Sequence, residues 1–128
     1  MLKYTEEKIF TQEQVQQLFL SINWVSGNYP KRLCKALMNS STVLTVWDGD
    51  FLVGLIRVLD DTEMLAQIHY VLVHPDYQRK EIASKMIGYI KEKYKDFMYL
   101  EVMPEDKNNM LFYKKNGFTL MENGIAMQ

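Results

Sequence analysis

The sequence has few of the residues that build disulfides and metal sites, since its 128 residues include one cysteine and two histidines. The lone cysteine, Cys34, cannot close an internal disulfide, which fits a reducing compartment, and we expect a cytoplasmic protein. Nothing nearby activates its thiol, so we interpret Cys34 as a small apolar residue on a helix. His69 and His74 stand apart from any pattern of further ligands, and we expect no metal site.

A strong charge of one sign and long apolar runs are also missing. The formal net charge is -1, which argues against a nucleic-acid-binding protein that depends on bulk positive charge. No apolar stretch could cross a bilayer, and no basic start followed by an apolar run marks a signal peptide. We therefore expect neither nucleic acid nor a membrane as a partner. The length and the hydrophobic content of 48% favour one domain over residues 1–128.

The spacing of apolar residues predicts strands and helices arranged around one sheet. Thr11, with Gln14 three residues later, predicts a capping box at the start of the first helix. Asp48-Gly49-Asp50 predicts a tight hairpin, because glycine supplies the positive φ that such turns need. The expected elements are strand 1–9, helices 12–23 and 31–38, strands 43–47, 51–58 and 64–73, helix 81–94, strand 97–102, helix 104–116, and a closing hairpin of strands 118–121 and 124–127.

This order predicts an α/β (α+β) fold in which a mixed sheet is flanked by helices. A strand that follows a helix can lie parallel to the strand before it, so we expect 97–102 beside the strand that ends at Val73. Trp24 and Tyr29 in the loop after the first helix are interpreted as cover for the core, with the lining of a pocket as the alternative. The two closing strands are candidates for pairing across a homodimer.

The stretch from Ile68 to Tyr89 contains the clearest candidate site. An apolar strand breaks at His74-Pro75-Asp76, a short polar turn follows, and Ile82, Met86 and Ile90 then recur at helical spacing. The first N–H groups of such a helix lack partners and lie at the positive end of its dipole. These features indicate a site for a phosphate-bearing ligand at residues 78–84. From the local pattern alone, a plain corner with solvated cations is the simpler interpretation.

Three segments resemble the GNAT superfamily of N-acetyltransferases, and together they extend the resemblance over essentially the whole chain. The family's central hairpin is similar to WDGDFLVG at 47–54. Its acetyl-CoA motif, V-x-P-x-Y followed by Q/R-x-x-G-x-G/A, resembles VLVHPDYQRKEIA at 71–83. Its C-terminal N-x-x-A-x-x-F-Y-x-x-x-G-F resembles DKNNMLFYKKNGF at 106–118. The resemblance implies a mixed, mostly antiparallel, twisted sheet of six or seven strands, about four helices and a splayed parallel strand pair.

The resemblance also implies that acetyl-CoA is the co-substrate. Backbone groups of Leu72 and Val73 would bind the pantetheine arm much as a neighbouring strand would. The amides from Arg79 to Ser84 would hold the pyrophosphate, in agreement with the argument from the helix start. The residues implied in coenzyme binding are Leu72, Val73, Gln78, Arg79, Lys80, Glu81, Ile82, Ala83, Ser84, Asp106, Asn109 and Tyr113.

Three residues depart from the family pattern. Glu81 replaces the first motif glycine, which would let the backbone approach phosphate without a Cβ. We expect the Glu81 carboxylate to point away from the ligand, because at about 4 Å it would repel the diphosphate by roughly 4 kcal/mol at an effective dielectric of about 20. Asp106 replaces an asparagine; it can cap a helix but cannot donate a hydrogen bond when ionised. Asn109 stands where alanine is common.

The resemblance implies direct attack of a neutral amine on the acetyl thioester, with Tyr113 as general acid. An ordinary tyrosine, with a pKa of about 10, stays protonated at neutral pH and can hydrogen-bond the leaving sulfur. The amine needs a base, which we place at Glu101. Asp60, Asp61, Glu63 and His69 are the other candidates. The acidic residues suggest a cationic acceptor such as a polyamine, an aminoglycoside-like amine or a protein amino group.

Two other functions fit the same sequence. One is an acyl-CoA-binding module of the same fold with weak or no catalysis, which Glu81 and Asp106 would explain. The other is a small α/β interaction protein without a cofactor, in which residues 78–84 are only a corner. Binding of the coenzyme would exclude the interaction protein without a cofactor. Release of the coenzyme thiol in the presence of amines would distinguish the enzyme from the acyl-CoA-binding module.

Overall fold

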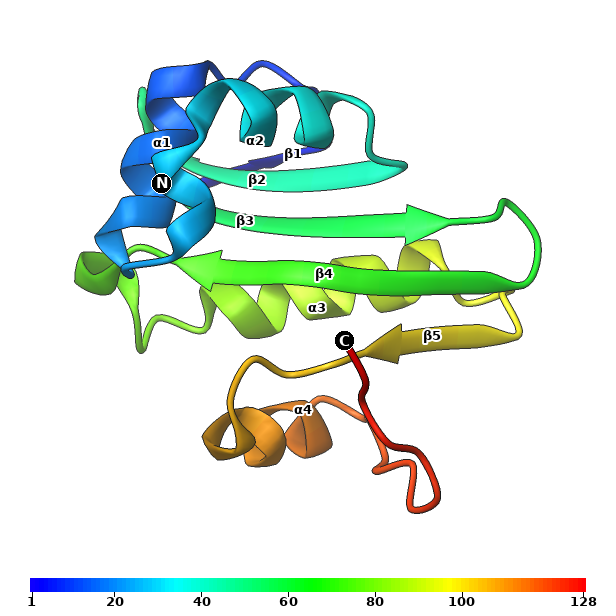
Figure 1. Cartoon of the computed structure of the whole chain (residues 1–128). Helices are drawn as coiled ribbons and strands as arrows, with labels where there is room; N and C mark the ends of the chain where they lie inside the picture. The colour runs from blue at the N-terminus through cyan, green and yellow to red at the C-terminus, as the bar shows by residue number, and fades with distance from the viewer.

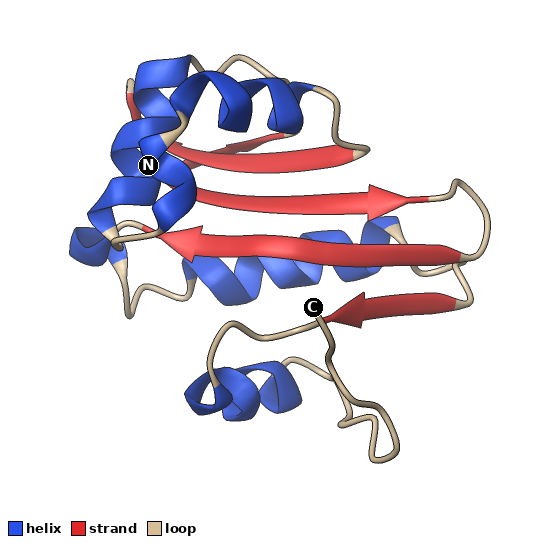
Figure 2. Ribbon diagram, in the orientation of Figure 1, coloured by secondary structure: helices blue, strands red, loops and turns tan.

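The computed structural model describes all residues, 1–128, and contains one five-stranded sheet (Figure 1 and Figure 2). The sheet has the order β1-β2-β3-β4-β5. The first three strand pairs are antiparallel, and β4 and β5 are parallel, which confirms the expected parallel pair. The strands are β1 (Lys3–Thr5), β2 (Thr42–Asp48), β3 (Phe51–Asp60), β4 (Leu65–Val73) and β5 (Tyr99–Val102).

Helices cover the two faces of the sheet. Helices α1 and α2 lie on one face, α3 lies on the other, and α4 lies beyond β5 (Figure 1). Three short 3-10 helices, η1, η2 and η3, connect these elements. The bounds are α1 (Gln12–Ser21), η1 (Val25–Asn28), α2 (Pro30–Met38), η2 (Pro75–Tyr77), α3 (Ile82–Lys93), η3 (Lys107–Asn109) and α4 (Met110–Lys115).

The core forms two apolar clusters that share the central strands. Leu55 of β3 packs in the cluster under α1 and α2, whereas the next residue, Ile56, packs in the cluster under α3. Both side chains are fully buried. Successive strand side chains point to opposite faces, so one strand contributes to both clusters. Burying a side chain of this size stabilises the fold by about 1.5–3 kcal/mol, and β3 is therefore a central support of the domain.

Tyr94, just after α3, fixes the end of that helix to the sheet. Its hydroxyl donates to Asp60 Oδ2 at 2.6 Å, and the hydroxyls of Tyr94 and Thr42 lie 2.7 Å apart. Burial, together with the bond to the Asp60 carboxylate, raises the pKa of Tyr94 to about 12. The phenol thus stays a donor, and this anchor sets the position of α3 from its C-terminal end.

The C-terminal segment differs from the sequence prediction. Residues 118–121 and 124–127 were expected to close the sheet as a hairpin, but they form no strand, so the sheet has five strands rather than six or seven. After Phe118, whose amide bonds Tyr113, the only backbone bond is a turn from Gly124 N to Met121 O. The alternating apolar residues find no buried surface, and Ile125 is 86% exposed. An isolated hairpin without such a surface is marginal in water.

The last helix also begins later than expected. We predicted a start at 104, but residues 107–109 form η3 and α4 begins at Met110. Asp106 caps η3, because its Oδ1 accepts the Asn108 amide at 2.8 Å. The capping role expected of Asp106 is therefore confirmed, on a 3-10 turn. None of the helices has the length and hydropathy required to span a bilayer.

The capping box at the start of α1 gives a test of the fold. Thr11 Oγ1 accepts the Gln14 amide at 3.2 Å, and the Thr11 amide donates to Gln14 Oε1 at 2.9 Å. The substitution Thr11→Ala should therefore lower the free energy of unfolding by about 1 kcal/mol, measured by urea denaturation. Thr119→Ala, in the exposed C-terminal segment, is the control and should change it little. Equal effects of the two substitutions would contradict the capping assignment.

Candidate active site

The site begins where two parallel strands part. The last paired residues of β4 and β5 are Ile68 and Val102, while β4 continues to Val73. Beyond that point β5 turns away and the facing edge of β4 has no strand partner. Backbone groups that lack a ladder partner need another one, from water or from a ligand. The splay predicted by the resemblance is therefore present, with an opening between the strands.

A β-bulge at Tyr70 reshapes β4 at the same place. Ile56 pairs with Val71, but the next residue of β3, Arg57, pairs with His69, so Tyr70 is the extra residue. Its φ of 70° lies in the left-handed region, which costs a residue with a side chain roughly 1–2 kcal/mol. The bulge brings the rings of His69 and Tyr70 to 4.3 Å between centroids, although neighbours in a regular strand point to opposite faces.

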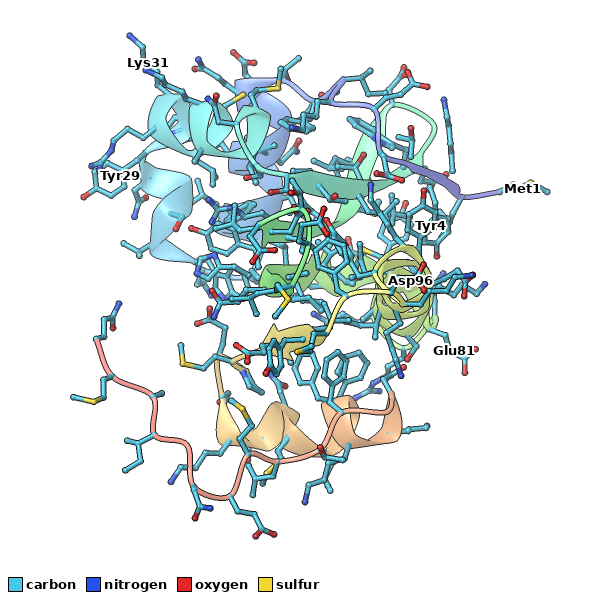
Figure 3. The ribbon with its side chains drawn as sticks, turned by 90° about the vertical axis from the view of Figure 1, so that its right-hand side faces the viewer. Met1, Tyr4, Tyr29, Lys31, Glu81 and Asp96 are labelled. Atoms are coloured by element: carbon cyan, nitrogen blue, oxygen red, sulfur yellow. The ribbon has the colours of Figure 1, made fainter.

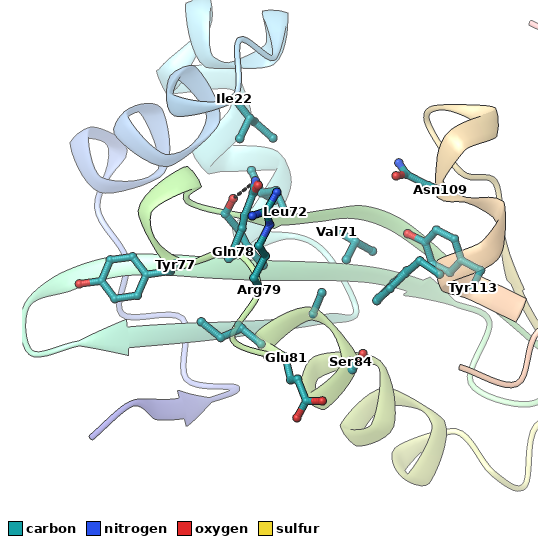
Figure 4. Close-up of a pocket in the computed structure, with 14 residues that line it drawn as sticks. Ile22, Val71, Leu72, Tyr77, Gln78, Arg79, Glu81, Ser84, Asn109 and Tyr113 are labelled. Atoms are coloured by element: carbon teal, nitrogen blue, oxygen red, sulfur yellow. Dashed lines mark hydrogen bonds between the residues drawn. The ribbon is translucent and has the colours of Figure 1, made fainter. Parts of the chain in front are cut away.

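A cavity of about 560 Å³ fills the opening (Figure 4). β4 forms one wall, the turn after it and the start of α3 form the floor, and α4 forms the opposite wall. This is the size range of a small-molecule site, and most of the lining is apolar. The lining residues are Ile22, Val71, Leu72, Val73, Tyr77, Gln78, Arg79, Glu81, Ile82, Ala83, Ser84, Asn109, Phe112 and Tyr113.

The floor of this cavity offers unpaired backbone donors. The amides of residues 79–84 make no hydrogen bond within the chain, and the first helical bond of α3 runs from Lys85 N to Glu81 O. Helix α3 has twelve residues, so its dipole adds to these amides at its N-terminus. Arg79 and Glu81 adopt φ angles of 66° and 61°. Alternating conformations of this kind turn successive amides toward one point, which is favourable for an anion.

The Glu81 side chain points away from the cavity floor. It is exposed and lies at the margin of the molecule (Figure 3), as we expected from the repulsion that it would otherwise exert. It makes no ion pair with Lys80 or Lys85. Glu81 therefore contributes a left-handed backbone to the floor while its carboxylate lies in solvent.

Tyr113 lies on the opposite wall, on α4. Its side chain is only 8% exposed, and its hydroxyl makes no hydrogen bond within the chain. Burial, with a smaller effect of the Glu105 charge, raises the pKa of Tyr113 to about 12. The phenol is therefore protonated at neutral pH, and its hydroxyl points toward the cavity (Figure 4). Lys91 of α3 holds the end of α4, because its Nζ donates to the Asn116 carbonyl at 3.0 Å.

A second cavity of about 60 Å³ adjoins the first at Tyr113. Val71, Asn109 and Tyr113 line both cavities, so the phenol lies between them. This smaller cavity lies on the side of η1, whose Ser26 hydroxyl is 2.7 Å from that of Tyr70. Its lining residues are Trp24, His69, Tyr70, Val71, Val102, Met103, Glu105, Asn109 and Tyr113.

Most residues predicted from the sequence meet at the larger cavity. Of the twelve implied in coenzyme binding, the lining includes Leu72, Val73, Gln78, Arg79, Glu81, Ile82, Ala83, Ser84, Asn109 and Tyr113. Lys80 and Asp106 do not line it: the Lys80 ammonium lies 5.6 Å above the Tyr77 ring, and Asp106 caps η3. Ile22, Val71, Tyr77 and Phe112 also line the cavity but were not predicted. Ile22, Val71 and Phe112 have the pattern of core residues, and Tyr77 was taken only as part of the polar turn.

The acidic candidates for a base lie elsewhere. Glu101 pairs with Gln67 on the closed part of the β4–β5 ladder and lines neither cavity. Asp61 accepts backbone amides of its own turn, from Glu63, Met64 and Leu65, and these bonds lower the pKa of its carboxyl group. Asp60 accepts the Tyr94 hydroxyl. Asp60, Asp61 and Glu63 of the β3–β4 turn line neither cavity.

Comparison with known proteins identifies the fold. The model of the acetyltransferase (GNAT) family matches residues 8–118. The chain belongs to this family. The matched residues include those that line both cavities, the parted strands and the start of α3.

Three relatives illustrate the likeness. An uncharacterized ycf52-like N-acetyltransferase of Prochlorococcus marinus is 31% identical over 116 residues, which are 87% of this chain and 64% of that protein's length. A GNAT family acetyltransferase from Streptococcus pneumoniae is 26% identical with a TM-score of 0.85, covering 100% of this chain and 96% of that one. AAC(6')-Iy, solved with CoA-S-monomethyl-acetylneamine, has 10% identity and a TM-score of 0.76, covering 100% and 97%, and shows the fold alone.

The left-handed backbone at Glu81 gives a test of the cavity floor. Glu81→Gly should raise the free energy of unfolding by up to about 1 kcal/mol, because it removes a Cβ penalty of roughly 1–2 kcal/mol and adds some unfolded-chain entropy. Urea denaturation measures the change. Glu81→Ala removes the same carboxylate but keeps a Cβ, so it should give no gain. If both variants gain equally, the charge rather than the backbone is responsible.

Proposed function

We propose that the protein is an acetyl-CoA-dependent N-acetyltransferase that transfers an acetyl group to a primary amine by direct attack. The observation that carries this proposal is the position of Tyr113. Its protonated, unpartnered hydroxyl lies between a large cavity with an anion-binding floor and a smaller cavity beside it. One cavity suits an acyl donor, the other suits an acceptor, and the phenol is within reach of both.

The residues of the larger cavity fit the coenzyme. The unpaired amides of 79–84 and the cation of Arg79 would hold its diphosphate at the start of α3. The open edge of β4 at Leu72 and Val73 would receive the amides of the pantetheine arm as a strand partner. The Gln78 side-chain amide, which donates to the Val73 carbonyl at 3.3 Å, would exchange that bond for one to the ligand. When bound, the coenzyme supplies the activated acetyl thioester.

Tyr113 acts on the leaving group. As an amine adds to the thioester carbon and the carbon–sulfur bond breaks, negative charge develops on sulfur. The Tyr113 hydroxyl can donate to that sulfur as general acid, and its raised pKa keeps the proton available at neutral pH. An ordinary thiol has a pKa of about 8.5, so a hydrogen bond in the transition state contributes more than complete proton transfer.

The proton of the amine needs an acceptor in the smaller cavity. Glu101, our expectation from the sequence, lines neither cavity. Glu105 is the carboxylate in the lining of the smaller cavity, on the loop between β5 and η3. We therefore propose Glu105, directly or through water, as the group that takes a proton from the acceptor ammonium, so that the neutral amine can attack the thioester carbon.

Coenzyme binding is the first test of the proposal. Isothermal titration with acetyl-CoA should show binding, and no heat at millimolar ligand would contradict the proposal. Glu81→Gln should tighten the Kd up to about fivefold at low salt and less at high salt, because an exposed charge is screened. Glu92→Gln, on the outer face of α3, removes the same charge away from the cavity and should leave the Kd unchanged.

Turnover tests the role of Tyr113. Tyr113→Phe should lower kcat by about a hundredfold, since a positioned general acid contributes on the order of 10²–10⁴. The Kd for acetyl-CoA should stay within about twofold. Tyr29→Phe, on an exposed ring, should change neither quantity. Unchanged turnover in Tyr113→Phe would remove the assignment of the general acid.

The second candidate function is an acyl-CoA-binding module of the same fold with weak or no catalysis. Glu81 and Asp106, which depart from the family motif, favour it. Thiol release with a panel of amines separates the two functions, because a module of this kind would bind acetyl-CoA without amine-dependent release of coenzyme A.

A further inference from the structure

One side of the smaller cavity is formed by His69 and Tyr70, which the proposed chemistry does not use. Arg57 of β3 and His69 of β4 are register partners, so their side chains lie on the same face of the sheet. Arg57 Nη1 and His69 Nδ1 are 2.9 Å apart. The bulge at Tyr70 places its ring beside both: the guanidinium lies 5.4 Å above the ring centroid. His69 and Tyr70 line the cavity, and Arg57 lies behind them.

The contact with Arg57 fixes the tautomer of His69. A guanidinium can only donate, so Nδ1 must accept and its lone pair is occupied. The neutral ring then carries its proton on Nε2, which makes no hydrogen bond within the chain. Desolvation and the Arg57 charge lower the pKa of His69, so the ring is neutral at pH 7. His69 therefore presents an N–H donor rather than a base, which removes it from the candidate bases.

The charge of Arg57 has no anionic partner. Arg57 Nε donates to Ser40 Oγ at 2.9 Å, and the remaining contacts are with His69 and Tyr70. No carboxylate lies within the distance of an ion pair. The side chain is half-buried, where an unpaired charge is costly. An anion held at the Nε2 edge of His69 would be stabilised by the N–H and by this charge behind it.

The smaller cavity also has an acidic residue in its lining. Glu105 lines it as the only carboxylate. Glu105, His69 and Tyr113 line the same cavity. The Glu105 charge adds to the raised pKa of Tyr113 and opposes part of the lowering of the His69 pKa. The volume of about 60 Å³ holds one small polar group beside the amine rather than a long chain. A ligand complementary to both walls has an ammonium or amine on one side and an oxyanion on the other.

We propose that the acceptor is a primary amine that also carries an oxyanion, a carboxylate or a phosphate, which His69 Nε2–H binds with the support of the Arg57 charge. The inference rests on the proposed N-acetyltransferase function and names its acceptor class. It takes the place of the cationic acceptor that the acidic β3–β4 turn suggested, because the carboxylates of that turn line neither cavity. His69 would bind the acceptor directly, and Arg57 would be a positioning residue.

Matched acceptor pairs test this proposal by thiol release from acetyl-CoA. In the carboxylate arm, each amino acid of a panel is compared with its amide; in the phosphate arm, each amino-sugar phosphate is compared with the free amino sugar. We expect kcat/KM to favour the oxyanion member of at least one arm by about tenfold or more, as expected for a hydrogen bond to a charged group. Amidation lowers the pKa of the amine, so more of the amide is in the reactive neutral form. This difference favours the amide and cannot itself produce the expected preference for the carboxylate.

Variants test the residues. Arg57→Met and His69→Phe should abolish the preference by raising KM for the oxyanion member, with little effect on its partner. His69→Gln, which can keep an N–H near the position of Nε2, should retain part of the preference, and so should Arg57→Lys. Arg32→Met, on exposed α2, is the control for loss of an arginine. A loss that affects both members equally would indicate a structural role only and would overturn the assignment.

A measurement without catalysis separates this proposal from the proposed function. N-acetylglycine, which carries the carboxylate but no free amine, is titrated into protein with ¹⁵N-labelled histidine. A saturable shift of the His69 Nε2 resonance in the native protein, absent in Arg57→Met, supports the anion site. If this shift is seen but no amine is acetylated, the proposed N-acetyltransferase function is contradicted and the anion site is not. Acetylation without preference in either arm, or no Nε2 shift, overturns the anion site and leaves the proposed function standing.

Discussion

The parting of β4 from β5 after Ile68 and Val102 is the constraint from which the site follows. As long as two parallel strands pair, their backbone groups satisfy one another and their side chains close over the core. Once they diverge, the edge of β4 loses its partner within the chain and a cavity of about 560 Å³ opens. Helix α4 then supplies the far wall, and Tyr113 reaches the gap from a helix that would otherwise cover only the edge of the sheet.

The bulge at Tyr70 determines which side chains line the smaller cavity. A regular strand would direct His69 and Tyr70 to opposite faces of the sheet, and one of the two rings would then lie on the side of α3. The extra residue, with φ of 70°, holds both rings on the side of η1. Such a backbone costs roughly 1–2 kcal/mol, and here it lies in the wall of the smaller cavity. Strained backbone of this kind is common at functional sites.

Periodicity was sufficient to predict the helices, the hairpin at Gly49 and the parallel pair, because each is fixed by local pattern and chain order. The helix-start argument likewise located the unpaired amides of the cavity floor, since these depend on local backbone only. The closing hairpin failed for a tertiary reason: alternation at 118–127 predicts strands, but no surface buries Ile125 and its neighbours. The position of Glu101 outside both cavities has the same origin, because residue type does not reveal where a ladder stops.

The contact between Arg57 and His69 could not be predicted from the sequence. Arg57 and His69 are joined only by the register of β3 and β4, and that register depends on a bulge with no glycine to mark it. A histidine in a strand suggests a base until its neighbour is known. The guanidinium beside Nδ1 reverses that interpretation, because it converts the ring from a proton acceptor into a donor.

Helix α4 has only six residues, from Met110 to Lys115, and a helix of this length does not persist by itself in water. Its C-terminal end is held by the hydrogen bond from Lys91 on α3 to the Asn116 carbonyl. The helix whose first turn leaves unpaired amides at the cavity floor therefore also carries Lys91, which holds the helix that bears Tyr113. The position of the Tyr113 hydroxyl at one end of the cavity thus depends on the placement of α3, which forms the floor at the other end.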